Sequence, residues 1–185
     1  GLSPADFART WVRGGHRIFD RLARLSKPTI AALNGHAFGG GLELAAACDI
    51  RVIAPKATIA LPEAGVGIVP GWSGSQRLVR LMPEGMVKEM ALFGRRIGAD
   101  RLLQCGFVAE VSDDPRTTAQ AIAEKATTLS PRATEITKAM IHAGRGEDQA
   151  ALIEALGSAA IAASEDRAEG VAAFQEKRKA DFPGT

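Results

Sequence analysis

The spacing of apolar residues changes along the chain. A helix start at Ser3-Pro4 is followed by apolar residues at roughly helical spacing, and Lys27-Pro28 ends this predicted helix because the residue before a proline is pushed to extended geometry. Short apolar runs then predict buried strands at 29–33, 49–54, 57–61 and 107–111. Helical patterns cover 42–48, 75–82, 83–93 and 99–104. Strands that alternate with helices predict an α/β fold with a parallel or mixed sheet.

From Pro115 onward, every segment has an alanine-rich helical pattern, and the last of these is a charged helix over 166–179. We therefore expect residues 1–114 to form an α/β part and residues 115–185 to form an all-helical part. A glycine- and proline-rich loop covers 62–74 within the first part. Functional side chains are often displayed on such loops.

Composition and charge exclude several classes of protein. With 46% apolar and 24% charged residues among 185, the chain has the makeup of a globular protein rather than a disordered one. The 23 basic and 21 acidic residues nearly cancel, which argues against a general nucleic-acid or membrane surface. No apolar run approaches the ~20 residues of a membrane-spanning helix. We therefore expect neither nucleic acid nor a membrane as a partner.

Cys48 and Cys105 lie far apart in apolar stretches, with no CxxC pattern and no nearby histidine. This is typical of buried structural thiols in a reducing compartment, so we expect a cytoplasmic protein. The three histidines, His16, His36 and His142, are dispersed, and no pair has the spacing of metal ligands. We expect no metal site, and we interpret His36 as a packing residue or a neighbour of the site.

Three glycines, Gly39-Gly40-Gly41, stand between a predicted strand and a predicted helix. The dinucleotide-binding fingerprint fails here because its third glycine would fall on Leu44, and the phosphate-binding loop fails because the required lysine is missing. The serine-hydrolase pattern Gly-x-Ser-x-Gly is not completed at 71–75. The glycine run therefore needs another explanation.

Glycines at a helix start let a ligand oxygen reach free backbone N–H groups, where the positive end of the helix favours negative charge. This is one half of an oxyanion hole. Glu43 lies in the first turn and can project beside the same point. The alternative is that the glycines only permit close helix–strand packing and that Glu43 complements the helix dipole.

A second carboxylate adds to this picture. Glu63 follows Leu61-Pro62 at the end of a predicted strand and opens the glycine-rich loop. Taken alone, it is equally well explained as a solvated loop acid. Together, Glu43 and Glu63 can supply a base and an acid around one water molecule if their surroundings move their pKa values apart.

The stretch from Lys27 to Leu44 resembles the signature of the crotonase (enoyl-CoA hydratase/isomerase) superfamily. Further stretches are similar to that family in the same order and extend the resemblance over nearly the whole chain: 48–50, 61–63, 67–71, 74–78 and 169–179. This joint set is far more specific than any one glycine motif. The resemblance implies a crotonase-like spiral ββα core followed by a C-terminal all-helical association domain.

The resemblance also implies a reaction. Gly40 matches the position whose N–H helps to hold the thioester oxygen, Glu43 matches the glutamate that activates water, and Glu63 matches the glutamate that exchanges the proton at the α-carbon. This set is typical of a 2-enoyl-CoA hydratase, a carbon–oxygen lyase. Isomerase branches commonly keep only one of the two acids, so the presence of both favours hydration. The alternatives are double-bond isomerisation or dehydration of another acyl-CoA, and a non-catalytic subunit.

Phe174 and Lys177 match a C-terminal pair that contacts coenzyme A in relatives, often from a neighbouring subunit. For Lys177, a solvated basic helix face is an equally good explanation. Coenzyme A is part of the substrate, so we expect no separate cofactor. The resemblance implies a homotrimer or a dimer of trimers, and it places Trp72 and Ser73 in a loop that faces the acyl pocket.

The front of the chain departs from the family pattern. Family members begin with a β-rich segment that supplies the other oxyanion N–H, from an Ala-Gly-Ala-Asp-like loop, and much of the adenine site. We find no equivalent motif in the sequence, which opens at Gly1. We therefore expect either part of a longer protein or a short paralogue with half a site.

Overall fold

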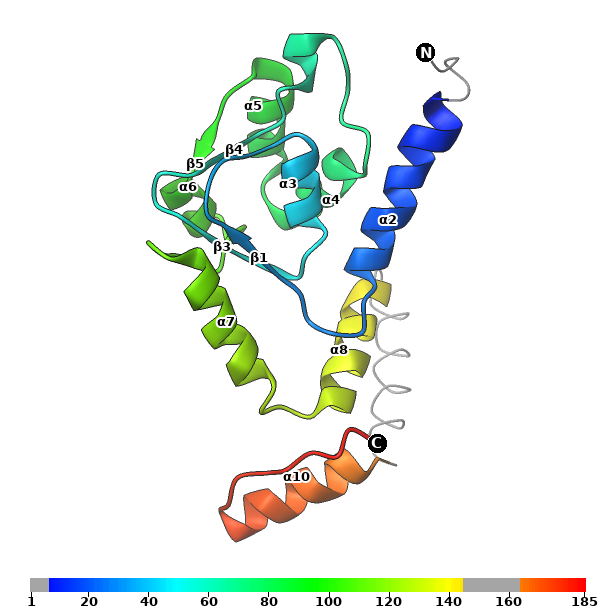
Figure 1. The fold of residues 1–185 in the computed structure, drawn as a ribbon, viewed down its shortest axis with the longest axis vertical. Coiled ribbons are helices and arrows are strands. Elements are labelled where there is room, and N and C mark those ends of the chain that lie inside the picture. The colour runs from blue at the N-terminus through cyan, green and yellow to red at the C-terminus, as the bar shows by residue number, and fades with distance from the viewer. Residues whose placement is uncertain (1–6, 145–163) are drawn as a thin grey trace. The chain divides into compact units, whose positions relative to one another are not determined.

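The computed structural model describes residues 7–144 and 164–185 (Figure 1). The chain divides into two compact units, one formed by Gly1–Leu25 and Thr29–Gln120, the other by Ser26–Pro28 and Ala121–Thr185. Helix α7 (Pro115–Ala126) crosses this division. The domain limit expected after residue 114 stays a prediction.

The first unit begins with a π-helix, η1 (Phe7–Val12), which continues into the α-helix α2 (Arg13–Ala23). Helix α2 buries Phe19 and Ala23 and ends before Pro28. The amphipathic helix predicted from the apolar spacing is thus confirmed, while its predicted start at Ser3-Pro4 lies outside the described residues.

One sheet of the first unit is entirely parallel. It has the strand order β1-β3-β6, with β1 (Ile30–Leu33) beside β3 (Ile50–Ile53) and β3 beside β6 (Glu110–Val111). Ile30 faces Ile50 in the register, and Leu33 faces Ile53. The strands predicted at 29–33 and 49–54 are therefore confirmed.

A second sheet has the order β2-β4-β5. Strand β2 (Ala37–Phe38) runs parallel to β4 (Thr58–Ala60), and β5 (Ile97–Gly98) runs antiparallel to β4. The strand predicted at 57–61 is confirmed as β4, whereas β2 and β5 are two residues long and leave no hydrophobic period to detect.

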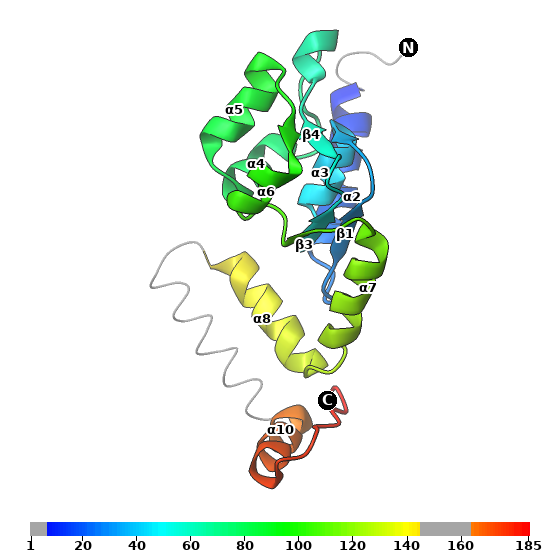
Figure 2. The same ribbon diagram turned by 90° about the vertical axis from the view of Figure 1, so that its left-hand side faces the viewer.

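The chain passes repeatedly between the two sheets, as Figures 1 and 2 show. Strands β1 and β3 lie in the first sheet, and the strands that follow them along the chain, β2 and β4, lie in the second. The order is reversed for the last two strands, because β5 lies in the second sheet and β6 in the first. Helices follow these strands: α3 (Gly40–Ala46), α4 (Gly74–Leu81), α5 (Glu84–Phe93) and, between β5 and β6, α6 (Ala99–Gln104). This is a spiral α/β arrangement, as the resemblance implied.

The helices enclose one apolar core together with the strands. Helices α4, α5 and α6 match the patterns predicted at 75–82, 83–93 and 99–104. The large side chains that are fully buried in this core come from both sheets and all four helices: Leu42, Ile53, Ile59, Leu61, Leu78, Met90, Ile97, Leu102 and Phe107.

The strand predicted at 107–111 is shorter than expected, because β6 contains only Glu110 and Val111. Gly106 (φ +78°) turns the chain at the end of α6, and the N–H groups of the next two residues return to the carbonyl of Leu102 (3.0 and 3.3 Å). The first part of this apolar run therefore closes a helix instead of extending the sheet.

The second unit contains the helices α8 (Pro131–Ala143) and α10 (Glu165–Glu176), which confirm the helical pattern over these residues. The helical pattern predicted over 145–163 lies outside the described residues. Each begins after a serine whose hydroxyl accepts a backbone N–H three residues further on. Helix α10 ends earlier than predicted because Lys177 has left-handed backbone geometry (φ +54°) and the chain turns back. Among the described helices, none is long and apolar enough to cross a membrane.

Candidate active site

The glycine run forms the turn that leads from β2 into α3. Gly39 has φ +51° and ψ −124°, a conformation that is strained for any residue with a side chain, and its N–H donates to the carbonyl of Ala60 (3.1 Å). Helix α3 begins at Gly40, two residues before the predicted start. The sequence pattern missed this because glycine is a poor helix former. The N–H of Gly40, as the first in a helix, has no acceptor within that helix.

Two neighbours leave no room for side chains at this turn. A Cβ on Gly39 would lie 2.9 Å from Oε1 of Glu63, and a Cβ on Gly40 would lie 2.9 Å from Cζ3 of Trp72. Close packing is therefore one use of the glycines, as the alternative interpretation held. The groups that pack here, however, are a carboxylate and an indole.

Glu43 is buried in α3, with 2% of its surface exposed. Its Oε1 accepts two backbone hydrogen bonds, from the N–H of Trp72 (2.8 Å) and from the N–H of Gly74 (2.9 Å). A Cβ on Gly74 would lie 2.5 Å from Cγ of Glu43, so the loop closes directly over this side chain. Glu43 therefore does more than complement the helix dipole, because a buried carboxylate with fixed partners is held in one orientation.

Glu63 is also buried, with 7% exposed, and it opens a short 3₁₀ helix, η2 (Glu63–Val66), directly after β4. The interpretation as a solvated loop acid is therefore wrong. Among the described residues, its Oε2 has no hydrogen-bond partner. Burial raises the pKa of Glu63, a backbone hydrogen bond opposes this, and the charge of nearby Glu43 raises the pKa further.

The two carboxylates thus reach the glycine turn from different elements and in different surroundings. Glu43 has one oxygen held by two N–H donors, whereas Glu63 has a buried oxygen without a hydrogen-bond partner among the described residues and a raised pKa. Such a difference between paired acids is the usual basis for a base and an acid in one site.

An aromatic wall stands beside the turn. The indole of Trp72 packs edge-on against Phe19 and at a tilt against Trp11, with ring centroids 5.4 Å apart in both pairs. Gly15 in α2 makes room for it, because a Cβ there would lie 2.1 Å from the indole Cδ1. Helix α2 therefore supports the wall of the site, a role that its hydrophobic spacing did not reveal.

An ion pair that the sequence analysis did not single out joins α2 to α4. Arg77 donates to the carboxylate of Asp20, and the backbone N–H of Arg77 bonds to the carbonyl of Ser73 (2.9 Å) at the start of α4. The only indication of Arg77 in the sequence was its place within 74–78, one of the stretches that resemble the family. The pair therefore links α2 to the helix that follows the loop over Glu43.

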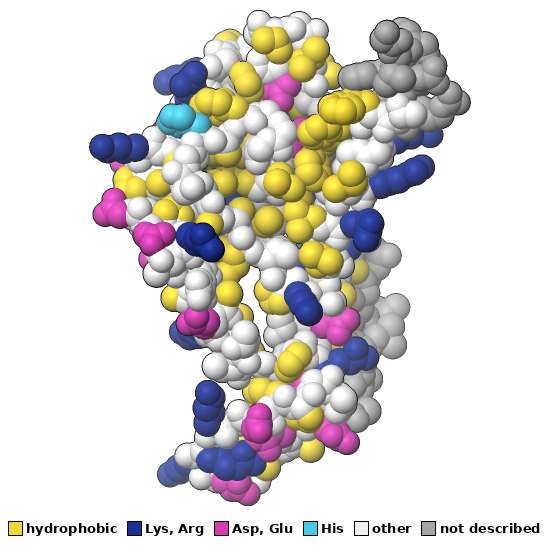
Figure 3. All heavy atoms as spheres, in the orientation of Figure 1, with side chains coloured by type: hydrophobic (Ala, Val, Ile, Leu, Met, Phe, Trp, Pro, Cys, Tyr) yellow, Lys and Arg dark blue, Asp and Glu magenta, His cyan; other side chains and the backbone are white. Residues whose placement is uncertain are grey.

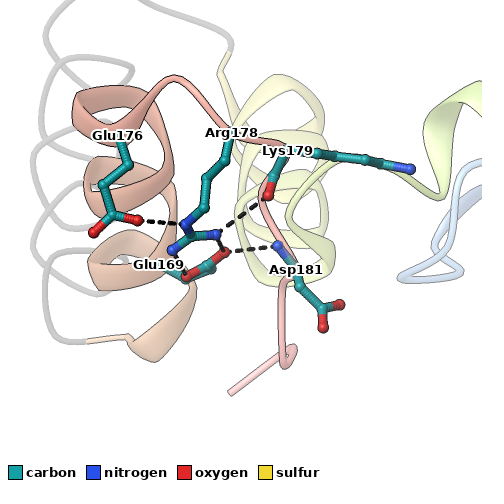
Figure 4. Close-up of polar contacts among 5 residues, drawn as sticks. All are labelled: Glu169, Glu176, Arg178, Lys179 and Asp181. Carbon is teal, nitrogen blue, oxygen red and sulfur yellow. Dashed lines mark hydrogen bonds and ion pairs between the residues drawn. The ribbon is translucent and has the colours of Figure 1, made fainter.

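Phe174 and Lys177 lie in the second unit, whereas the two glutamates lie in the first. Phe174 is 86% exposed, and Lys177 is an exposed residue at the end of α10. Figure 4 shows how the neighbouring charges are used: Arg178 bonds to Glu169 (2.6 Å) and Glu176 (2.5 Å). The solvated helix face and the coenzyme A contact remain alternatives for Lys177.

The remaining candidates have local roles. His36 stacks on Phe38 (5.4 Å) and its Nδ1 accepts the N–H of Thr58 (3.1 Å), which makes it a packing residue. Cys48 and Cys105 are half-buried rather than buried as predicted, and each directly follows a helix, α3 and α6 respectively. In the described part of the chain, no cluster of His, Cys, Asp or Glu side chains is suited to a metal ion.

This chain is similar to known proteins over most of its length. The family model described as enoyl-CoA hydratase/isomerase matches residues 5–185. The short-chain-enoyl-CoA hydratase of Clostridium acetobutylicum is 40% identical over 169 residues, which cover 89% of this chain and 65% of that protein. The crotonyl-CoA hydratase of Syntrophomonas wolfei is 38% identical over 179 residues, 95% of this chain and 69% of its own. The chain thus spans about two thirds of the length of these relatives.

A solved structure extends the likeness to the fold. The crystal structure of an enoyl-CoA hydratase from Bacillus anthracis superposes on the whole chain with a TM-score of 0.93 and 34% sequence identity. The match covers 73% of that structure. The likeness therefore includes the spiral core that carries the glycine turn and both glutamates.

Proposed function

Since the chain belongs to the enoyl-CoA hydratase/isomerase family, we propose that it catalyses the reversible addition of water across the 2,3 double bond of a 2-enoyl-CoA thioester. One observation carries this proposal: two buried glutamates with different hydrogen bonding meet at a helix start that has free N–H groups. Hydration of an enoyl thioester needs a base, an acid and a donor to the thioester oxygen, and these are the three groups present.

In this proposal, the N–H of Gly40 donates to the thioester oxygen. Attack on the β-carbon moves negative charge onto that oxygen, and a fixed N–H at the positive end of α3 stabilises the charge as it develops. Because the donor is already in place, the protein does not reorganise when the charge appears. Gly40 contributes through its backbone, so its lack of a side chain is part of its function.

Glu43 and Glu63 then divide the proton transfers. Glu43 takes a proton from water through Oε2, since its Oε1 is occupied by two N–H donors, and the oxygen of that water forms the bond to the β-carbon. Protonated Glu63 gives its proton to the α-carbon, and the thioester carbonyl is restored. The raised pKa of Glu63 supports this role, because it enlarges the protonated fraction near neutral pH. The proton on Glu43 returns to Glu63 through solvent or product release.

The surroundings of Glu63 support an acyl substrate. The loop that follows it exposes three apolar side chains, those of Val66 (73%), Ile68 (60%) and Val69 (78%). Figure 3 shows hydrophobic side chains gathered on this face of the first unit. An acyl chain requires apolar contacts of this kind. Coenzyme A enters as part of the substrate, and the proposal includes no separate cofactor.

We extend the proposal to assembly as a homotrimer or a dimer of trimers, with the helices after residue 114 as the association domain. Among the described residues of the second unit, Ala173 is the buried apolar side chain, whereas larger ones are exposed: Leu129, Ile141, Val171 and Phe174. Association with another subunit would remove such side chains from water, so their exposure is compatible with this proposal. Contact of Phe174 and Lys177 with coenzyme A belongs to the same proposal.

The test is hydration of crotonyl-CoA by the complete gene product, followed as loss of the conjugated enoyl absorbance. Glu43→Gln and Glu63→Gln should each lower kcat by about 10²–10⁴-fold, because each removes a proton-transfer group. Glu110→Gln, at an exposed position of β6, is the matched control and should retain full activity.

Two outcomes would contradict the proposal. If the wild-type protein binds crotonyl-CoA without turnover, it is a non-catalytic subunit. If it converts a 3-enoyl-CoA to a 2-enoyl-CoA faster than it hydrates the product, it is an isomerase. Retained activity in either glutamate variant would show that the roles are assigned to the wrong residues.

A further inference from the structure

The loop residues 72–74 hold Glu43 entirely through their backbone. The N–H groups of Trp72 and Gly74 both donate to Oε1 of Glu43, and the residue between them, Ser73, has φ +72° and ψ +13°. A left-handed residue in a turn directs the N–H groups on either side of it into one concave anion site. The convergence of two donors on one carboxylate oxygen therefore depends on the backbone conformation of Ser73.

Ser73 has an unusual conformation for its residue type. In the described part of the chain, it and Lys177 are the residues other than glycine with positive φ. Serine before a helix ordinarily caps it with the hydroxyl, but Ser73 makes no such bond to α4, whose first backbone bond runs from Arg77 to the Ser73 carbonyl (2.9 Å). At this position the backbone of Ser73 makes the contact with α4, and its side chain does not cap the helix.

The residues on both sides of Ser73 are held in place. Gly74 has no space for a Cβ, and the indole of Trp72 is wedged between Gly15 of α2 and Gly40 of α3. A strained backbone conformation persists only where its surroundings determine it. If residue 73 left the left-handed region, its neighbours could not follow, and the two N–H groups would no longer converge on Glu43.

We propose that Ser73 is a positioning residue for the reaction, because its left-handed backbone fixes Oε1 of Glu43 and thereby presents Oε2 to the attacking water. This inference rests on the proposed hydratase function. It implies that residues which adopt the left-handed conformation readily, such as glycine and asparagine, support full activity at position 73. A β-branched residue, for which this conformation is a severe outlier, does not.

The kinetic test compares Ser73→Gly, Ser73→Asn and Ser73→Val in the full chain with crotonyl-CoA. We expect the Gly and Asn variants to stay within about twofold of wild type. We expect the Val variant to lose at least tenfold in kcat with KM within about threefold, because the backbone of Ser73 acts on Glu43, whose proposed role is in the chemical step. Ser75→Val, at an exposed position one residue into α4, is the matched control and should be unaffected. Where Ser73→Val does not fold, Ser73→Ala should show a smaller loss of kcat.

A second measurement does not depend on activity. An amide proton that donates to a carboxylate resonates downfield, so Glu43→Gln should move the amide proton signals of Trp72 and Gly74 upfield. Ser73→Gly should keep the wild-type shifts, and Ser73→Val should move them as Glu43→Gln does. Unchanged shifts in Ser73→Val would overturn the inference.

The two measurements separate this inference from the function on which it rests. If the wild-type protein does not hydrate crotonyl-CoA but the amide shifts respond as expected, the hydratase proposal fails and Ser73 still positions Glu43. If the wild type hydrates crotonyl-CoA and Ser73→Val does so at the same rate, the inference fails and the function stands. A defective Ser73→Gly variant would show that the hydroxyl, rather than the backbone, is what matters.

Discussion

Among single residues, Glu63 shows most clearly how the fold changes the surroundings of a side chain. In the sequence it is an acid in a glycine-rich loop, whereas in the structure it is buried beside a second carboxylate. Burial of an ionisable group without a partner favours its neutral form. In the proposed mechanism this side chain donates a proton, and its raised pKa makes the stability of the folded state depend on pH.

The pH dependence of stability follows from the sign of this shift. Because the folded state raises the pKa of Glu63, the unfolded state releases this proton first, and stability falls as the pH rises from the ordinary glutamate value through the raised one. Glu63→Gln removes this loss. We expect its thermal unfolding midpoint to exceed that of wild type at pH 8, with a smaller difference at pH 4, as measured by circular dichroism.

The same shift bears on the proposed catalysis. Hydration needs protonated Glu63, so kcat in the hydration direction should fall as the pH rises through the raised pKa. A pH–rate profile of wild-type enzyme checks this. A rate that stays flat from the ordinary glutamate value of 4.5 to alkaline pH would show that Glu63 does not donate the proton.

At the scale of elements, the packing of α2 against Trp72 shapes the site. Gly15 and Gly14 are adjacent in α2, yet a Cβ on Gly15 would lie 2.1 Å from the indole and a Cβ on Gly14 would have no neighbour within 4 Å. Gly15→Ala should destabilise the protein by about 1–3 kcal/mol through overpacking. It should also lower kcat, because Trp72 carries one of the two donors to Glu43.

Gly14→Ala is the matched control for this prediction. It adds the same methyl group to the same helix in open space, so its effect should be neutral or stabilising by up to about 1 kcal/mol. Denaturant unfolding of both variants measures the difference. Equal stability of the two variants would show that α2 does not press against the indole as described.

The sequence predicted most elements of the first unit because their apolar periods are local. The strands at 29–33, 49–54 and 57–61 and the helices α4, α5 and α6 lie where the pattern placed them. The errors fall where tertiary contacts override the pattern. The run at 107–111 closes α6 instead of forming a full strand, and α3 begins inside the glycine run.

At the scale of the whole molecule, the two units are held differently. The first unit has an apolar core, and in the described part of the second unit polar contacts fold the tail back onto α10. Glu169 accepts hydrogen bonds from Arg178 and from the N–H of Asp181 (2.7 Å), and Asp166 accepts one from the N–H of Gly184 (2.6 Å). The packing of the tail against α10 therefore depends on the charges of Glu169 and Asp166.

Acid should release this tail. The hydrogen bond from Arg178 lowers the pKa of Glu169 from its ordinary 4.5 to about 2, so its stabilising effect is present above pH 4.5 and is lost as the pH falls toward 2. The amide proton of Asp181 should shift upfield over this range in an NMR titration. Glu169→Gln should remove that transition, and Glu176→Gln, which leaves the Asp181 contact in place, should keep it.

The sequence alone determined the family, the spiral α/β architecture and the identity of the two candidate glutamates, because short motifs and local hydrophobic periods encode these features. The tertiary structure decided how the glutamates differ. Three features depend on contacts between segments far apart in the sequence: the burial of Glu63, the two N–H bonds to Glu43 and the left-handed turn at Ser73. A local pattern records which residues avoid water, but not which distant backbone groups will meet a buried carboxylate.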